Sequence, residues 1–161
     1  MTQQYITRLG IAEDSEIVTR VARAIVKDSL VTARFGSDLF FISCEKLAGV
    51  SFYYALAREL GVSVEGDALA SIANHLMRNR PTLLVLDHLD EVWETPAVSW
   101  DKVNEVNGLL SRLANIPSLS LIVTCKKFEN IWSVEWSNSG IWIRTRTKPD
   151  AGSWHRSTQG R

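Results

Sequence analysis

The stretch that decides the fold covers residues 83–93 and reads LLVLDHLDEVW. It opens with four aliphatic residues without polar alternation, a pattern typical of a strand that is covered on both faces in a parallel sheet. The aliphatic run ends on Asp87. A carboxylate at the end of such a strand can hold a Mg²⁺-bound water beside the phosphates of a nucleotide. Many α/β proteins also end a strand with aspartate, so the position by itself indicates only a candidate Mg²⁺ site.

Helical and strand patterns alternate on both sides of this run. Helices are expected over residues 17–26, 50–60, 67–78 and 100–114, and strands over residues 38–44, 82–86 and 119–124. Gly10, after residues 5–9, marks what remains of a first strand. Strands that alternate with helices through short turns indicate right-handed crossovers and a doubly wound α/β sheet. In such sheets function gathers at the carboxyl ends of the strands.

The composition is that of one globular domain. The chain has 161 residues, of which 45% are hydrophobic and 22% charged, and its eighteen basic residues balance eighteen acidic ones. This balance gives no charge signature for nucleic acid or for a membrane surface. The N-terminus lacks the uninterrupted apolar region of a signal peptide, and no apolar run in the chain is long enough to span a membrane. Cys44 and Cys125 each end an apolar run, so we expect reduced core thiols and a cytoplasmic location, with a disulfide as the less favoured alternative.

The overall balance conceals an asymmetry between the two parts of the chain. Residues 1–125 carry eleven basic and fifteen acidic side chains, a net charge of −4, whereas residues 126–161 carry seven and three, a net charge of +4. Four of the six tryptophans lie in the last thirty residues, where periodicity is lost except at residues 140–144. We therefore expect a domain over residues 1–127 and an irregular tail over residues 128–161 that contains one short strand.

Three segments together resemble one family. LLVLDHLDEVW is similar to the Walker B segment of the STAND class of P-loop ATPases, in particular the NB-ARC-like signalling proteins of filamentous fungi, whose pattern is roughly L-L-V-L-D-N-hydrophobic-E-x-V-W. Upstream, ARFGSDLFFISCEKL (residues 33–47) resembles the second strand of that family and its lead-in. Downstream, LLSRLANIPSLSLIVTCK (residues 109–126) resembles the helix and strand that end in the sensor 1 motif. The resemblance covers residues 20–126 and implies a three-layer P-loop NTPase-like parallel sheet, which we expect to be incomplete.

The resemblance also assigns roles to individual residues. Asp87 matches the Mg²⁺-site aspartate of the family. The family's sensor 1 motif ends in arginine, whereas here Lys126 follows Thr124 and Cys125. A lysine keeps the charge but loses the bidentate fork of arginine. Thr124 and Lys126 are therefore candidate contacts to ADP or ATP.

The phosphate-binding loop is where the match with the family fails. Alignment sets the family's G-G-I-G-K-T on residues 14–19, which read DSEIVT, so that only Thr19 is retained. Val18 stands at the position of the lysine and belongs to the apolar stripe of a plain amphipathic helix. Glu13, Asp14 and Glu16 suit the positive end of a helix but would repel phosphate. We therefore expect a degenerate Walker A motif that binds ADP or ATP with Mg²⁺ weakly.

Other polar residues have less specific patterns. Asp90 and Glu91 are candidates to polarise water, but the favoured interpretation of His88, Asp90 and Glu91 is a solvated loop, because they lack the spacing of a convergent metal site. His75 is expected at a helix boundary or on the surface. Trp93 and Trp100 are expected to pack in the core or to contact a partner rather than a nucleotide. The sequence around His155 offers no second ligand at a spacing typical of a site.

Three functions follow in order of preference. The first is a nucleotide-binding (ADP/ATP) signalling-switch domain with weak or absent hydrolysis, because Asp87, Thr124 and Lys126 persist. Thr19 is a further candidate contact to the nucleotide. The second is a pseudo-NTPase that acts as a protein-interaction module, or a truncated gene product without nucleotide binding. An active ATPase is the least favoured. The expected partners are intact NB-ARC-type relatives or a second copy of the chain, with no nucleic acid and no membrane. The abrupt loss of similarity after Val134 to Trp136 favours the hypothesis of a fragment or an altered gene product.

Overall fold

The structure is a computed structural model that describes residues 8–11, 15–47, 51–78, 80–93 and 100–125. The region expected to form the tail, residues 128–161, lies outside these described residues, as do Lys126 and the acidic pair Glu13 and Asp14. The proposed boundary after residue 127 and the expected short strand at residues 140–144 therefore stay predictions.

A four-stranded parallel sheet forms the middle layer. Its strands are β1 (Arg8–Ile11), β2 (Leu39–Ser43), β3 (Thr82–Asp87) and β4 (Leu119–Thr124). They are arranged in the order β1-β4-β3-β2, so the last strand lies between the first and the third. β3 is buried along its whole length, as its continuous aliphatic run predicts. The α/β fold class is confirmed.

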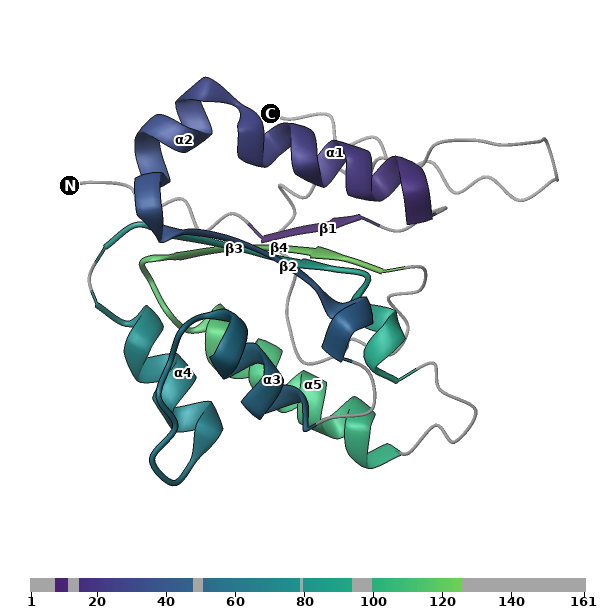
Figure 1. Ribbon diagram of the computed structural model, residues 1–161, viewed down its shortest axis with the longest axis vertical. Helices are drawn as coiled ribbons and strands as arrows, with labels where there is room; N and C mark the ends of the chain where they lie inside the picture. Colours follow the sequence, from purple (N-terminus) through teal and green to yellow (C-terminus); the bar gives the residue numbers. More distant parts are fainter. Residues whose placement is uncertain (1–7, 12–14, 48–50, 79, 94–99, 126–161) are drawn as a thin grey trace, which may run out of the picture.

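Helices cover both faces of this sheet (Figure 1). One face carries α1 (Ser15–Lys27) and α2 (Ser29–Phe35), and the other carries α3 (Phe52–Glu59), α4 (Ala68–Leu76) and α5 (Trp100–Ala114). The described part of the chain also contains three short 3₁₀ helices: η1 (Gly36–Asp38), η2 (Cys44–Leu47) and η3 (Leu89–Val92). The layers are thus helix, sheet and helix, as a doubly wound sheet requires.

Local sequence signals explain several of the helix boundaries. Asp67 caps α4 because its carboxylate accepts hydrogen bonds from the amides of Leu69 and Ala70. Gly61, which follows α3, has φ +68°, a conformation that glycine adopts without the steric cost that a Cβ imposes. The sequence patterns missed α2, although Asp28 caps it in the same way that Asp67 caps α4. α2 has seven residues and none of them is buried, so it lacks the long apolar stripe that reveals a helix.

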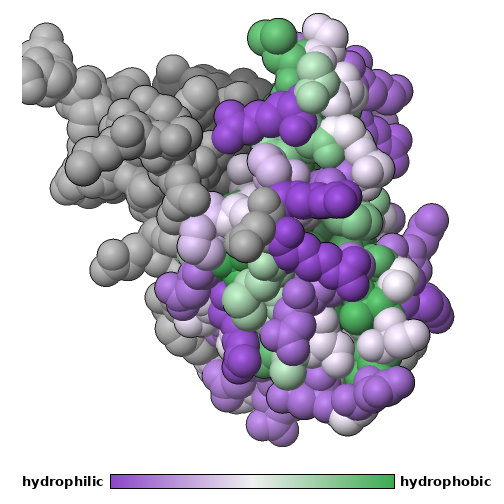
Figure 2. Space-filling view, turned by 90° about the vertical axis from the view of Figure 1, so that its left-hand side faces the viewer, coloured by the Kyte–Doolittle hydropathy of each residue, from purple (hydrophilic) through white to green (hydrophobic). Residues whose placement is uncertain are grey.

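The surface of the described residues is mixed. Figure 2 shows hydrophilic residues over much of the described part of one side, with hydrophobic residues between them. The large hydrophobic side chains that are exposed are Leu30, Tyr54, Met77 and Trp100. No helix among the described residues combines the length and the apolar composition that a bilayer crossing requires.

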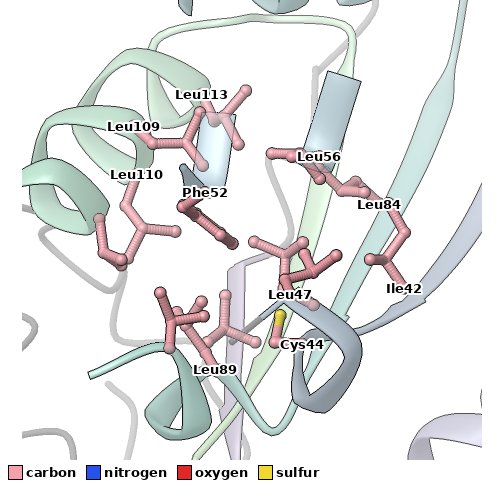
Figure 3. Packing of buried hydrophobic residues seen from close by; sticks show 14 of the residues in the cluster. Ile42, Cys44, Leu47, Phe52, Leu56, Leu84, Leu89, Leu109, Leu110 and Leu113 are labelled. Atoms are coloured by element: carbon pink, nitrogen blue, oxygen red, sulfur yellow. The ribbon is translucent and has the colours of Figure 1, made fainter. Parts of the chain in front are cut away.

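The two sides of the sheet have hydrophobic cores of unequal size. The larger core lies between the sheet and α3, α4 and α5, and in Figure 3 the ring of Phe52 lies among leucines such as Leu47 and Leu110. The smaller core, toward α1 and α2, is built on Ala22, Leu83, Val85 and Ile122. Among the described residues, most of the buried apolar area therefore lies on the α3–α5 side, and the free energy gained scales with that area.

Both cysteines are buried and free, as predicted. Trp93 is buried too, in line with a packing role, whereas Trp100 at the start of α5 is exposed. His75 is partly buried near the end of α4, which agrees with its expected place at a helix boundary. Burial lowers the pKa of His75, and the neighbouring Arg78 lowers it further while Asp38 opposes this shift.

Candidate functional site

Two strand ends meet where the candidate site lies. Side chains alternate between the faces of a strand, so Asp87 shares a face with Leu83 and Val85, which belong to the core on the α1 side. Thr124 shares a face with Ile122 of the same core for the same reason. The register pairs Leu86 of β3 with Val123 of β4, and Asp87 and Thr124 come next in the two strands. Both polar side chains therefore project toward α1 from neighbouring carboxyl ends.

Asp87 is the centre of a hydrogen-bonded network. Its carboxylate is buried, with 1% of the residue exposed, and it accepts one hydroxyl bond at each oxygen. Thr124 Oγ1 donates to Asp87 Oδ1 at 2.6 Å, and Thr19 Oγ1, from α1, donates to Asp87 Oδ2 at 2.9 Å. Three candidate site residues separated by as many as 105 positions in the sequence (124 − 19) thus meet at one carboxylate. These bonds compensate part of the cost of burying a charge-bearing group.

His88 completes this network, although the sequence interpretation assigned it to a solvated loop. Its backbone has φ 56° and ψ 49°, the left-handed conformation in which histidine, asparagine and aspartate are enriched among non-glycine residues. Its amide donates to Thr124 Oγ1 at 2.9 Å. Its Nδ1 lies 3.3 Å from Asp87 Oδ2, 3.5 Å from Thr19 Oγ1 and 3.7 Å from Glu45 Oε1. Only 12% of the His88 side chain is exposed, so the solvated-loop interpretation of His88 is wrong.

The interpretation of a solvated loop is also wrong for Asp90. The segment forms η3, and Asp90 is 1% exposed, whereas Glu91 is partly exposed. Asp90 lies between Leu89 and Val92, which are three residues apart, one turn of a 3₁₀ helix, and both belong to the larger core. Asp90 and Glu91 stay candidates for polarising water.

Cys44 lies close to the carboxylates of Asp87 and Asp90. Burial raises the pKa of its thiol far above the ordinary value, and the charges of Asp87 and Asp90 raise it further. A thiol in such surroundings stays protonated and unreactive. Cys44 is therefore a structural neighbour of the site rather than a nucleophile.

The described residues of α1 lack the features of a phosphate-binding loop. Val18, at the position aligned with the P-loop lysine, is buried with 4% of its surface exposed, as its place in the apolar stripe predicts. Glu16 is exposed in the first turn of α1. A carboxylate at this end of the helix competes with a phosphate for the same positive potential. In the described residues of α1, no lysine precedes Lys27 at the carboxyl end.

The oxygen donors of the site fit Mg²⁺ better than a transition metal. Mg²⁺ in proteins is usually held by one or two carboxylates and completed by water and substrate phosphates, whereas an all-protein site needs more ligands. Asp87 supplies one carboxylate and Thr19 and Thr124 supply hydroxyl oxygens. No group of three or more His, Cys, Asp or Glu side chains in the described part of the chain is arranged to hold a metal by itself. The donor set therefore suits an ion that arrives with a nucleotide.

The structure brings together Thr19, Asp87 and Thr124, which the resemblance named as candidates, and adds His88 and Glu45 to the same neighbourhood. Nothing local marks Glu45, which follows β2 in η2 and lies near His88 only because β2 and β3 are neighbours. His88 could have been noticed, because it directly follows the strand-ending aspartate. A scan against protein-family models finds no match for this sequence, and a search of curated proteins finds none either.

Proposed function

We propose that this chain is a nucleotide-binding domain of the NB-ARC/STAND type, which binds Mg·ADP or Mg·ATP weakly and does not turn the nucleotide over. The observation that carries the proposal is the 2.9 Å hydrogen bond from Thr19 Oγ1 to Asp87 Oδ2. In P-loop NTPases, a Ser or Thr of the phosphate loop and the Walker B aspartate together hold Mg²⁺. The resemblance made Asp87 the Mg²⁺-site aspartate and Thr19 a candidate nucleotide contact from two separate segments, and their side chains are in direct contact.

The topology supports the same location. Ligands of open parallel sheets bind outside the carboxyl ends of the strands, where successive connections leave toward opposite faces. Beyond β1 the chain continues into α1 on one face, whereas beyond β3 it continues through η3 to α5 on the other (Figure 1). Asp87, Thr124 and Thr19 gather at this point of divergence.

Thr19 and Asp87 would hold the Mg²⁺, and the ion would neutralise phosphate charge when bound. Thr124 fixes the orientation of Asp87, because it donates to Oδ1 and leaves Oδ2 directed toward Thr19. His88 corresponds to the asparagine that follows the aspartate in the family pattern, and both residue types tolerate the left-handed backbone found here. Weak binding follows from the buried Val18, since no ammonium group takes the lysine's place beside the phosphates.

In intact relatives, by resemblance, ADP holds the protein closed and exchange for ATP opens it for oligomerisation. We extend to this chain only the binding step of such a signalling switch. Hydrolysis needs a positioned water and a charge that stabilises the transferred phosphoryl group. Val18 makes the position of the P-loop lysine apolar, so we propose that the domain binds nucleotide without hydrolysing it.

A second function is favoured by the completeness of the network. Both oxygens of Asp87 accept threonine hydroxyl bonds, so the carboxylate is stabilised without any ligand. Such a site can be retained for its structural value in a pseudo-NTPase that acts as a protein-interaction module. The two functions differ in one measurable respect, which is whether the nucleotide binds.

Isothermal titration calorimetry with ADP and ATP, each with Mg²⁺ and with EDTA, separates them. The expected result is weak binding that requires Mg²⁺ and is lost in Asp87→Ala and weakened in Thr19→Val. Glu65→Gln is the matched charge-removal control, because Glu65 is exposed in the turn before α4. Absence of heat up to millimolar nucleotide would support the interaction module instead. Binding that Asp87→Ala leaves intact would overturn the proposed site.

A further inference from the structure

The outer edge of β2 lacks a partner within the described chain. β2 pairs with β3 along one side, and it is the last strand in the order β1-β4-β3-β2. Its sequence, LFFIS, contains no charged residue and no proline. Natural edge strands usually carry such residues, because an unprotected row of backbone amides and carbonyls attracts another strand. β2 has none of these protections.

The side chains of β2 are apolar toward both faces of the sheet. Phe40 packs against the larger core and Phe41 against the smaller one, and both remain partly exposed. The guanidinium carbon of Arg23 lies 5.7 Å from the centre of the Phe41 ring, on the α1 side. A strand that docks here would therefore gain hydrophobic contacts above and below the sheet as well as backbone hydrogen bonds.

We propose that the occupant of this edge is β2 of a second copy of the chain. A two-fold axis perpendicular to the sheet at Phe41 would pair the strands antiparallel, with Phe41 facing Phe41. In this register Phe40 lies opposite Ile42, and Leu39 lies opposite Ser43. All five residues of β2 are paired, and the two four-stranded sheets join into one continuous sheet.

The register is compatible with the charges that flank β2. Asp38 precedes the strand and Glu45 follows Cys44, so the axis at Phe41 sets Asp38 opposite Cys44 rather than opposite another acid. Like charges directly across a strand pair would destabilise it. The central pair is instead aromatic, which is among the favourable cross-strand combinations. The strand is therefore self-complementary, which favours a second copy over an unrelated strand.

The dimer rests on a short strand pair, so it should dissociate on dilution. Sedimentation velocity of the full chain over a range of concentrations is expected to show a reversible monomer–dimer equilibrium. Phe41→Lys would bring two ammonium groups together at the axis and weaken the dimer by roughly 100-fold. Phe41→Glu would do the same, and a mixture of the two variants should form a heterodimer. Leu30→Lys is the control, because Leu30 is 80% exposed on α2 and is not part of the β2 strand, and it should not alter the equilibrium.

A second measurement keeps the test valid if the charged variants fail to fold, which far-ultraviolet circular dichroism would reveal. Phe41→Cys should be cross-linked into a dimer by a short bifunctional thiol reagent, whereas Leu30→Cys should not. The natural Cys44 and Cys125 are buried and serve as an internal background. A wild-type chain that stays monomeric at every concentration, or a dimer that persists unchanged in Phe41→Lys without cross-linking at position 41, would overturn the proposal. These readouts do not involve nucleotide, so their outcome is independent of the proposed function.

Discussion

Thr124 Oγ1 donates a 2.6 Å hydrogen bond to Asp87 Oδ1 and accepts one from the amide of His88 at 2.9 Å. A single hydroxyl therefore joins the end of β4 to the end of β3 and to the turn that follows it. Thr124 is 2% exposed, so water cannot readily replace it when the hydroxyl is removed.

Replacement of this hydroxyl should destabilise the fold. Thr124→Val keeps the shape of the side chain but leaves a buried carboxylate oxygen and a buried amide each short of one partner. The expected loss in the free energy of unfolding is about 1–3 kcal/mol, measured by urea denaturation. Thr32→Val, the same change at an exposed position of α2, should stay within about 0.5 kcal/mol of the wild type. Equal losses in the free energy of unfolding for both variants would show that the hydrogen bonds at Asp87 contribute no more to stability than those of an exposed threonine.

A lysine introduced at the position of the P-loop lysine should not restore nucleotide binding. Val18 is buried on α1, one turn before Ala22 of the smaller core, so Val18→Lys would force an ammonium group out of contact with water. The expected cost is at least about 3 kcal/mol in urea denaturation, without a gain in affinity for Mg·ATP by calorimetry. Ala24→Lys on the exposed face of α1 should change stability by no more than about 0.5 kcal/mol. A stable Val18→Lys variant with tighter binding would mean that residue 18 reaches the phosphates after all.

Stability should fall in alkaline solution because of Cys44. Burial raises the pKa of its thiol above the ordinary 9.0, with Asp87 and Asp90 as further causes, so above pH 9 the unfolded chain releases this proton while the folded chain retains it. The folded state then binds more protons, and its stability decreases as the pH rises. Cys44→Ala lacks this ionisation. The free energy of unfolding of the wild type should therefore fall toward that of Cys44→Ala, and the difference between them should shrink by up to about 1.4 kcal/mol per pH unit above pH 9. Urea denaturation at pH 8, 9 and 10 under reducing conditions measures it. A difference that is constant with pH would contradict the expectation.

A phenolic hydroxyl joins α3 to α5 in addition to their shared apolar core. Tyr53 Oη donates to the backbone carbonyl of Glu105 at 2.6 Å, and burial raises the pKa of this phenol, with smaller contributions from Glu105 and Asp67. Tyr53→Phe should cost about 0.5–1.5 kcal/mol of stability, because the carbonyl loses its donor. Tyr54→Phe is the matched control, since Tyr54 is 54% exposed, and it should be close to neutral. Thermal unfolding of the two variants side by side distinguishes them.

Local patterns in the sequence were sufficient for the elements that bury a continuous face. The limits of α5 and β4 match the prediction, and β3 extends one residue further, to Asp87 itself. The strand expected over residues 38–44 is shorter, because Asp38 and Cys44 belong to 3₁₀ helices at its ends. A periodic apolar pattern reflects the burial of one face, and that information is carried by residues close together in the chain.

The meeting of Thr19, Asp87 and Thr124 has a different origin. The sequence, through a resemblance, marked each of them as a candidate, and alternation along β3 and β4 fixes the face to which Asp87 and Thr124 belong. Only the tertiary structure decided that β4 lies beside β3, that His88 adjoins the Asp87 carboxylate, and that Glu45 in turn lies beside the His88 ring. Strand order and helix placement depend on long-range packing of whole elements, which leaves no local trace in the sequence. The sequence by itself thus determined most of the helices and strands and their buried faces, whereas the packing of distant segments decided which polar side chains share a site.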